Sequence, residues 1–194
     1  MIPQRARKDG EYFVLGCLGP YPPTTLGLVP KLAGPAWMTG RPITIDVPDP
    51  LVFHLNPTYP GEMKAFYTAR IPVMRDDLLN VLRSTGVDNL QLYNAIVRDT
   101  VKNIDYTNYK AFNIIGVIAA ADLPASTLMF PQEPHMVDMM FESLAVDDSK
   151  ISGPLMFRLA ESVNAIMVHR RVKDAVTAAG IAGMVFYAPE DWAG

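Results

Sequence analysis

Proline is concentrated in the first third of this chain. Of the 17 prolines among 194 residues, ten lie between Pro20 and Pro60. Proline has no amide hydrogen to donate to a sheet, and it biases the preceding residue toward extended backbone. Residues 1–70 are therefore predicted to form turns, edge strands and irregular loops. Their strand-like apolar segments are Glu11–Leu18, Ile43–Val47 and Leu51–Leu55.

From residue 71 onward the chain has regular periodicity. Helices are predicted at about 75–85 and 169–179, because each segment has an apolar stripe and a glycine just past its end. The predicted strands are 89–97, 109–122, 139–146, 155–160, 165–168 and 184–187. Strands without regular alternation with helices indicate an α+β fold with a mostly antiparallel sheet. We expect one domain over 1–194, with an irregular part at 1–70 and a regular core at 71–188.

The segment from Tyr109 to Asp122 has apolar residues at both odd and even positions, so both faces of an extended strand would be apolar. Such a segment is typical of a strand buried between two layers. Ile115 and Val117 lie on this predicted strand. On that basis we expect Ile115→Ala to cost about 2 to 5 kcal/mol of stability, the usual range for large-to-small core changes.

Charge and cysteine content restrict the partners and the compartment. The formal charge is −3 and the pI is about 5.6, so the sequence lacks the excess of Lys and Arg that binds nucleic acid or anionic lipid. No apolar run approaches the roughly 18 residues of a membrane span. Cys17 is the sole cysteine, which excludes an internal disulfide and suits a reducing compartment. We expect a cytoplasmic protein that binds neither nucleic acid nor membrane.

The common catalytic and cofactor motifs do not occur. The chain has no GxxxxGK[ST] or GxGxxG phosphate loop, no GxSxG elbow and no HExxH pair. His54, His135 and His169 are widely separated, so only the fold could bring them together around zinc. Cys17 would act as a nucleophile only if a histidine reached it, and a lone cysteine between apolar residues is usually a core residue. We expect no catalytic residue, no cofactor and no metal.

Arg158 is an unusual charge within an apolar strand. Its neighbours Phe157 and Leu159 point to one face of the predicted strand, and Arg158 points to the other. A buried arginine is usually paired. We expect Arg158 to pair with an acid in or beside the sheet.

Four stretches of the regular part carry a resemblance to a known family. They are Leu78-Leu79 with 86–91, 108–117, 155–161, and 166–169 with Val172 and Gly180. In order and spacing they resemble the Imm11 immunity-protein family of bacterial polymorphic toxin systems. The resemblance covers about residues 70–187, and its motifs are mainly signatures of buried strands and helices. They identify a scaffold, and function does not follow from a scaffold alone.

The resemblance implies an immunity protein that binds and neutralises a toxin encoded by a neighbouring gene, by stoichiometric and non-catalytic inhibition. The expected contact surface is the loop region at 12–67. Its candidate aromatic anchors, if exposed, are Tyr21, Trp37, Tyr59, Phe66 and Tyr67. A charge of −3 suits a basic partner, such as a nuclease toxin.

A second hypothesis belongs to a different class of function. The N-terminal loops could instead form the site of an enzyme or a small-ligand-binding protein, around Cys17, Asp46, Asp49 and His54. A deep pocket with convergent polar groups would favour this hypothesis, and a shallow aromatic or acidic patch would favour the inhibitor.

Overall fold

The computed structural model describes residues 10–32, 37–130 and 138–194. Within them, helices and mixed sheets confirm the predicted α+β class. The helices are α1 (Asp76–Ser84) and α2 (Arg170–Ala178), with single 3-10 turns at Leu123–Ala125, Asp148–Lys150 and Pro189–Asp191. The strands are β1 (Tyr12–Cys17), β2 (Leu26–Leu28), β3 (Leu51–Leu55), β4 (Phe66–Tyr67), β5 (Val73–Arg75), β6 (Leu90–Asp99), β7 (Ile104–Ile114), β8 (Val117–Ile118), β9 (Thr127–Leu128), β10 (Phe141–Ser143), β11 (Met156–Leu159), β12 (Ile166–His169) and β13 (Met184–Tyr187).

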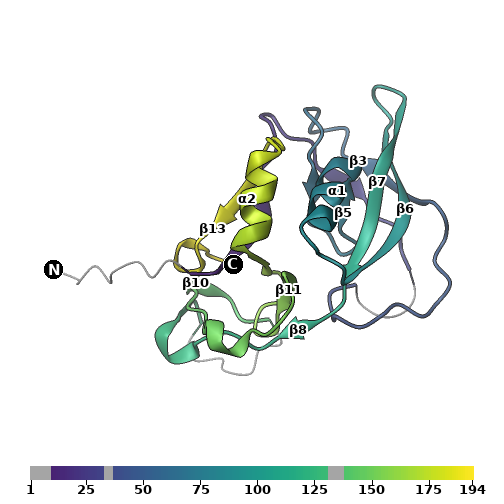
Figure 1. Ribbon diagram of the computed structural model, residues 1–194. Helices are drawn as coiled ribbons and strands as arrows, with labels where there is room; N and C mark the ends of the chain where they lie inside the picture. Colours follow the sequence, from purple (N-terminus) through teal and green to yellow (C-terminus); the bar gives the residue numbers. More distant parts are fainter. Residues whose placement is uncertain (1–9, 33–36, 131–137) are drawn as a thin grey trace.

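Two main sheets form the two halves of the molecule in Figure 1. One has five strands in the order β13-β1-β12-β11-β8, and the other has six in the order β2-β3-β6-β7-β5-β4. Most neighbours are antiparallel, and the pairs β8–β11 and β3–β6 are parallel. A small antiparallel pair, β9–β10, forms a separate two-stranded sheet.

The longest feature is the hairpin of β6 and β7. The sequence predicted strands at 89–97 and 109–122, but β6 extends to Asp99 and β7 begins at Ile104, so the turn between them is short. The polar residues belong to strand ends that reach into solvent, where polar side chains have no desolvation cost. Arg98 and Asp105 stabilise this end as a cross-strand pair, with Nε and Oδ1 at 2.7 Å.

The single strand predicted over Tyr109–Asp122 is wrong beyond Ile114. Gly116 has φ +116°, a conformation that glycine adopts without steric cost, and the chain leaves the sheet there. It then enters the five-stranded sheet as β8. Ile115 is consequently only partly buried and Val117 is exposed, so neither is the core residue that the sequence indicated.

Both helices lie where the sequence placed them. Leu78, Leu79 and Leu82 are the buried face of α1, and the Asp77 carboxylate at its start accepts hydrogen bonds from the Arg75 guanidinium and from the Leu78 amide. Bonding to Arg75 lowers the pKa of Asp77. At the start of α2, the Nδ1 atom of His169 accepts a hydrogen bond from the Arg171 amide at 3.1 Å, and Val172 and Val176 are buried. The apolar stripes and the glycines that follow them are local signals, which is why the sequence located both helices.

One apolar cluster joins the two sheets. It contains Leu78 and Leu82 of α1, Val172 and Val176 of α2, and Phe112 of β7, together with residues of β1, β11 and β12. Both helices therefore pack into the same core between the sheets. A separate cluster with Tyr12, Val14, Phe141, Phe157 and Met167 covers the other face of the five-stranded sheet.

The proline-rich third covers the other face of the six-stranded sheet. Trp37 and Ile43 pack there against Phe53, Tyr109 and other strand residues. The predicted strand Ile43–Val47 does not form. Prolines flank it at positions 42 and 48, and the Gln91 side chain takes the place of a partner strand: its amide bonds both the N and the O of Ile43 at 2.8 Å.

Arg158 is almost fully buried in β11, with 2% of its surface exposed. Its guanidinium donates to the carbonyl oxygen of Val163, and within the described part of the chain it makes no ion pair. The acid partner that we expected is thus not among the described residues. Burial lowers the pKa of Arg158 to about 10, so the sheet holds a buried charge at neutral pH.

Both helices of the described residues are nine residues long, and no described helix is long and apolar enough to cross a membrane.

The observed burial indicates that stability should depend more on the side chain of Phe112 than on that of Ile115. Phe112 is fully buried in the cluster that joins the sheets, whereas Ile115 is partly exposed. We expect Phe112→Ala to lower the free energy of unfolding by about 3 to 5 kcal/mol, and Ile115→Ala by less than about 1.5 kcal/mol. Urea unfolding measures both, and equal losses would mean that the chain does not leave the core at Gly116.

Candidate functional site

Two loops of the proline-rich third lie against each other beyond the end of β3. The amide of Thr24 donates to the carbonyl of Glu62 at 3.0 Å, and the amide of Glu62 donates to the carbonyl of Pro22 at 2.9 Å. The amide of Asn56 donates to the carbonyl of Thr25 at 2.8 Å. The few amide donors that the prolines leave are therefore used to hold loop 20–25 against loop 56–62.

Buried hydroxyl groups anchor these loops to the sheet. The Tyr67 hydroxyl lies 2.6 Å from Thr24 Oγ1 and accepts a hydrogen bond from the Lys64 amide at 3.1 Å. The Tyr109 hydroxyl on β7 donates to the Lys64 carbonyl at 2.7 Å. Burial raises the pKa of both tyrosines, so the phenols stay neutral and act as hydrogen-bonding groups. The loops are thereby bonded to the sheet and to each other.

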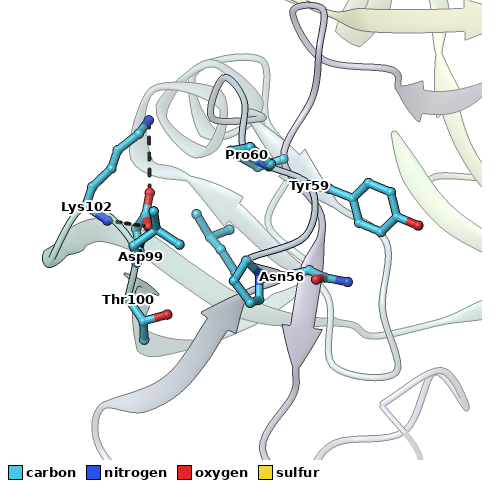
Figure 2. Close-up of a pocket in the computed structure, with 10 residues that line it drawn as sticks. Asn56, Tyr59, Pro60, Asp99, Thr100 and Lys102 are labelled. Carbon is cyan, nitrogen blue, oxygen red and sulfur yellow. Dashed lines mark hydrogen bonds and ion pairs between the residues drawn. The ribbon is translucent and has the colours of Figure 1, made fainter.

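A narrow hollow separates loop 56–60 from the turn of the β6–β7 hairpin (Figure 2). Its volume is about 20 Å³, which is room for one water molecule. Asn56 and Pro60 lie on one side, and Asp99, Thr100 and Lys102 lie on the other. This hollow is a seam between two surface elements and is too small for a substrate.

The hairpin side of the hollow is held by Asp99. This carboxylate is buried, and its Oδ1 atom accepts hydrogen bonds from the amides of Val101 and Lys102, both at 2.9 Å. Asn103 follows with φ 55°, a conformation that asparagine tolerates better than most residues. Both side-chain bonding and backbone conformation therefore specify the turn.

Two of the five candidate anchors are exposed. Tyr21 has 93% of its surface exposed and Tyr59 has 57%, and the Tyr59 ring points away from the hollow in Figure 2. Trp37, Phe66 and Tyr67 are each 3% exposed or less. Trp37 packs edge-on against Tyr93, with ring centroids 5.0 Å apart, and Phe66 packs against Phe112 at 5.7 Å. The buried rings serve the core, and partner binding through Tyr21 and Tyr59 stays a prediction.

A second, wider hollow lies over β6 and β7 near Asp49. It is open to solvent, with a volume of about 370 Å³. Asn94 Nδ2 donates to Asp49 Oδ2 at 3.2 Å, and Lys110 Nζ donates to Asn94 Oδ1 at 3.0 Å. A carboxylate, an amide and an ammonium group therefore meet at this place. Their hydrogen bonds are made largely to one another, which leaves fewer groups free for a ligand.

The structure does not bring together the other residues of the enzyme hypothesis. His54 pairs with Arg98 on the neighbouring strand, four residues from Asn94 or roughly 13 Å along the sheet. Asp46 is exposed, and Cys17, a partly buried free thiol, ends β1 in the other sheet. His169 caps α2, and His135 lies outside the described residues. Among the residues with a described position, no three His, Cys, Asp or Glu side chains cluster as metal ligands do.

Strands at 89–97 and from Tyr109 were predicted as an antiparallel hairpin, which the structure confirms, but the apolar residues of its turn were not singled out. Val101 is 64% exposed and Ile104 is 43% exposed, so two apolar side chains lie at the tip of an otherwise polar segment. The signal was visible as isolated aliphatic residues between Asp99 and Asp105, a stretch that a solvated loop would fill with polar residues. That stretch lay between the two predicted strands, so these residues were not considered as part of a surface.

Neither the family models nor the curated proteins with which the chain was compared gave a match. A functional conclusion therefore depends on the residues of this chain and their geometry.

The buried Tyr67 hydroxyl group predicts that Tyr→Phe changes at two tyrosines will differ in their effect on the free energy of unfolding. Tyr67→Phe removes the hydroxyl that bonds Thr24 and the Lys64 amide, and it leaves buried polar groups without their partner. We expect a loss of about 1 to 3 kcal/mol in unfolding free energy. The matched change Tyr21→Phe alters an exposed ring and should stay within about 0.5 kcal/mol. Equal values in denaturant titrations would show that the buried hydroxyl does not anchor the loops.

Proposed function

We propose that this chain is an immunity protein of the Imm11 type, which binds a toxin encoded by a neighbouring gene and inhibits it without catalysis. The observation that carries the proposal is the presence of two exposed aromatic rings, Tyr21 and Tyr59, on loops that are bonded to each other and to the core. Tyrosines of this kind are frequent anchors of protein interfaces.

The order of the loops supports protein binding in energetic terms. Association loses affinity when loops and side chains must be immobilised, at about 0.5 to 1.5 kcal/mol for each ordered side chain. Backbone bonds between Pro22, Thr24 and Glu62 already fix the loop pair in the free protein. A surface that is ordered before binding retains more of its contact energy as affinity.

The resemblance in residues 70–187 supports the toxin as the kind of partner. Its four stretches correspond to α1, to the end of β7 with Gly116, to β11, and to β12 with α2. Of these elements, β7 is bonded directly to the N-terminal part, because the Tyr109 hydroxyl donates to the Lys64 carbonyl. We propose that the protein acts in the cytoplasm of the producing cell, because a free cysteine suits a reducing compartment. The formal charge of −3 would favour encounter with a basic toxin, such as a nuclease.

A second candidate function is small-ligand binding at the hollow beside Asp49. The observation that favours it is the meeting of Asp49, Asn94 and Lys110 next to an open volume of about 370 Å³. A small polar ligand could exchange for the Asp49–Asn94 bond there. If this hollow rather than the exposed tyrosines is the functional site, Asp49→Asn should abolish protection of the cell against the toxin, and Tyr59→Ala should leave that protection unchanged.

The proposal predicts one-to-one protection. Co-expression of the toxin gene with increasing amounts of this chain should rescue growth only when the chain equals the toxin in amount, and calorimetric titration should give one site per toxin. Tyr21→Ala or Tyr59→Ala should weaken binding about thirtyfold, the effect of losing an anchor worth about 2 kcal/mol.

Phe112→Ala is the control for folding. It should reduce protection only in proportion to the loss of folded protein, since Phe112 is fully buried. Full protection by a few per cent of the toxin's amount, or protection without a detectable complex, would overturn the inhibitor proposal in favour of catalysis.

A further inference from the structure

We propose that Arg158 of β11 is the binding site for a small carboxylate, which its guanidinium holds through the edge formed by Nε and Nη2. The inference goes beyond the immunity function and does not depend on it. It starts from the burial of this side chain, since Arg158 is the one arginine among the described residues that is almost fully buried.

Two other arginines of this protein bind carboxylates through the same edge. Arg75 donates from Nε to Asp77 Oδ1 at 2.8 Å and from Nη2 to Asp77 Oδ2 at 2.6 Å. Arg98 donates from the same two nitrogens to the two oxygens of Asp105, both at 2.7 Å. The planar fork of a guanidinium matches the two oxygens of a carboxylate in this arrangement. The Nε–Nη2 edge is therefore the element of arginine that recognises carboxylates in this chain.

In Arg158 this edge has no partner among the described residues. Its Nη1 atom donates to the carbonyl oxygen of Val163, and this is the one hydrogen bond of the side chain within the described ranges. Nε is buried and has no hydrogen-bond partner there. No described carboxylate forms an ion pair with the guanidinium. The bond to Val163 thus fixes the guanidinium and leaves its carboxylate-binding edge for a ligand.

A buried cation with unused donors lowers the stability of the fold. Burial lowers the pKa of Arg158 to about 10, and the side chain therefore stays charged at neutral pH. An apolar residue of similar volume at this position would avoid the desolvation of the charge. A bound carboxylate offsets the same cost, because it supplies a counter-charge and two acceptors together. Retention of an arginine here is thus explained by a ligand and not by packing.

Two acids of the same region do not supply these acceptors. Asp138 accepts three hydrogen bonds from residues 162–164 and so holds the connection between β11 and β12. Glu161 lies three positions from Arg158 in the chain, but its Oε2 atom is buried and makes no hydrogen bond to the described residues. Neither acid is therefore the partner of the guanidinium in this structure.

The position of Arg158 restricts the size of the ligand. Only 2% of its surface is exposed, so an acidic side chain on the surface of a folded partner cannot reach the buried edge. Its neighbour β8 is the edge strand, is two residues long and lies at the margin of the molecule (Figure 1). The bond from the Arg158 amide to the Gly116 carbonyl is long, at 3.5 Å. A small carboxylate therefore enters beside this weakly held strand.

The test uses the full chain and acetate as the probe, with chloride replaced by acetate at constant ionic strength. The Nε–H signal of Arg158 in a nitrogen–proton NMR spectrum is identified by its loss in Arg158→Lys. It should move and saturate as acetate rises to about 100 mM. The melting temperature should rise by about 3 to 6 °C at ten times Kd, because acetate binds the folded state. Arg158→Lys keeps the charge but lacks the edge, so its melting temperature should not respond to acetate.

Two variants are controls for the site. Arg98→Lys removes an exposed edge that Asp105 already binds, and Glu161→Gln removes the nearest acid in the chain, so both should keep the full acetate response. A stronger response in Glu161→Gln would show that Glu161 pairs with Arg158 in solution and overturn the inference.

Other results would also overturn the inference. A response that persists in Arg158→Lys would assign acetate to another place. Equal melting temperatures of the unmodified chain in acetate and in chloride, with no movement of any arginine Nε–H signal, would exclude the site even if Arg158→Lys did not fold. None of these results bears on toxin binding, so the immunity function is tested separately.

Discussion

The burial of β7 on both faces is the constraint on which the other elements depend. Phe112 and Ile114 point to the cluster shared with α1 and α2, and Tyr109 and Ala111 point to the cluster beneath the proline-rich third. One strand therefore joins the helical layer, the five-stranded sheet and the N-terminal loops. Because a fully buried side chain cannot move without leaving a void, a displacement of β7 would disturb all three at once.

Local signals explain what the sequence could predict. Both helices have their apolar stripe and terminal glycine within a dozen residues, and strands such as Met184–Tyr187 are short apolar runs between turn residues. Alternation shows that a segment is extended, but it does not show which sheet the segment joins. For this reason the change of sheet at Gly116 was missed, although the glycine itself was visible.

The same limit applies to the candidate site. Aromatic residues in proline-rich loops all look like surface anchors, yet Trp37, Phe66 and Tyr67 are buried because strands far away in the sequence cover them. Only long-range contacts distinguish these rings from Tyr21 and Tyr59. The Ile43 segment shows a related effect, since a side chain, Gln91, supplies the hydrogen bonds that a strand would supply. No local pattern marks that replacement.

The coupling between core and loops has a consequence for function. Tyr67 and Tyr109 belong to the core cluster between the six-stranded sheet and the proline-rich third. Their hydroxyl groups hold the loop pair that carries Tyr21 and Tyr59. Much of the free energy that orders this surface is therefore supplied by folding rather than by binding. A partner that recognises the ordered loops gains affinity from that order, and it stabilises the folded state in return by the same linkage. A substitution in the core can thus weaken binding without touching the interface, which is why folded fraction and affinity must be measured on the same variants.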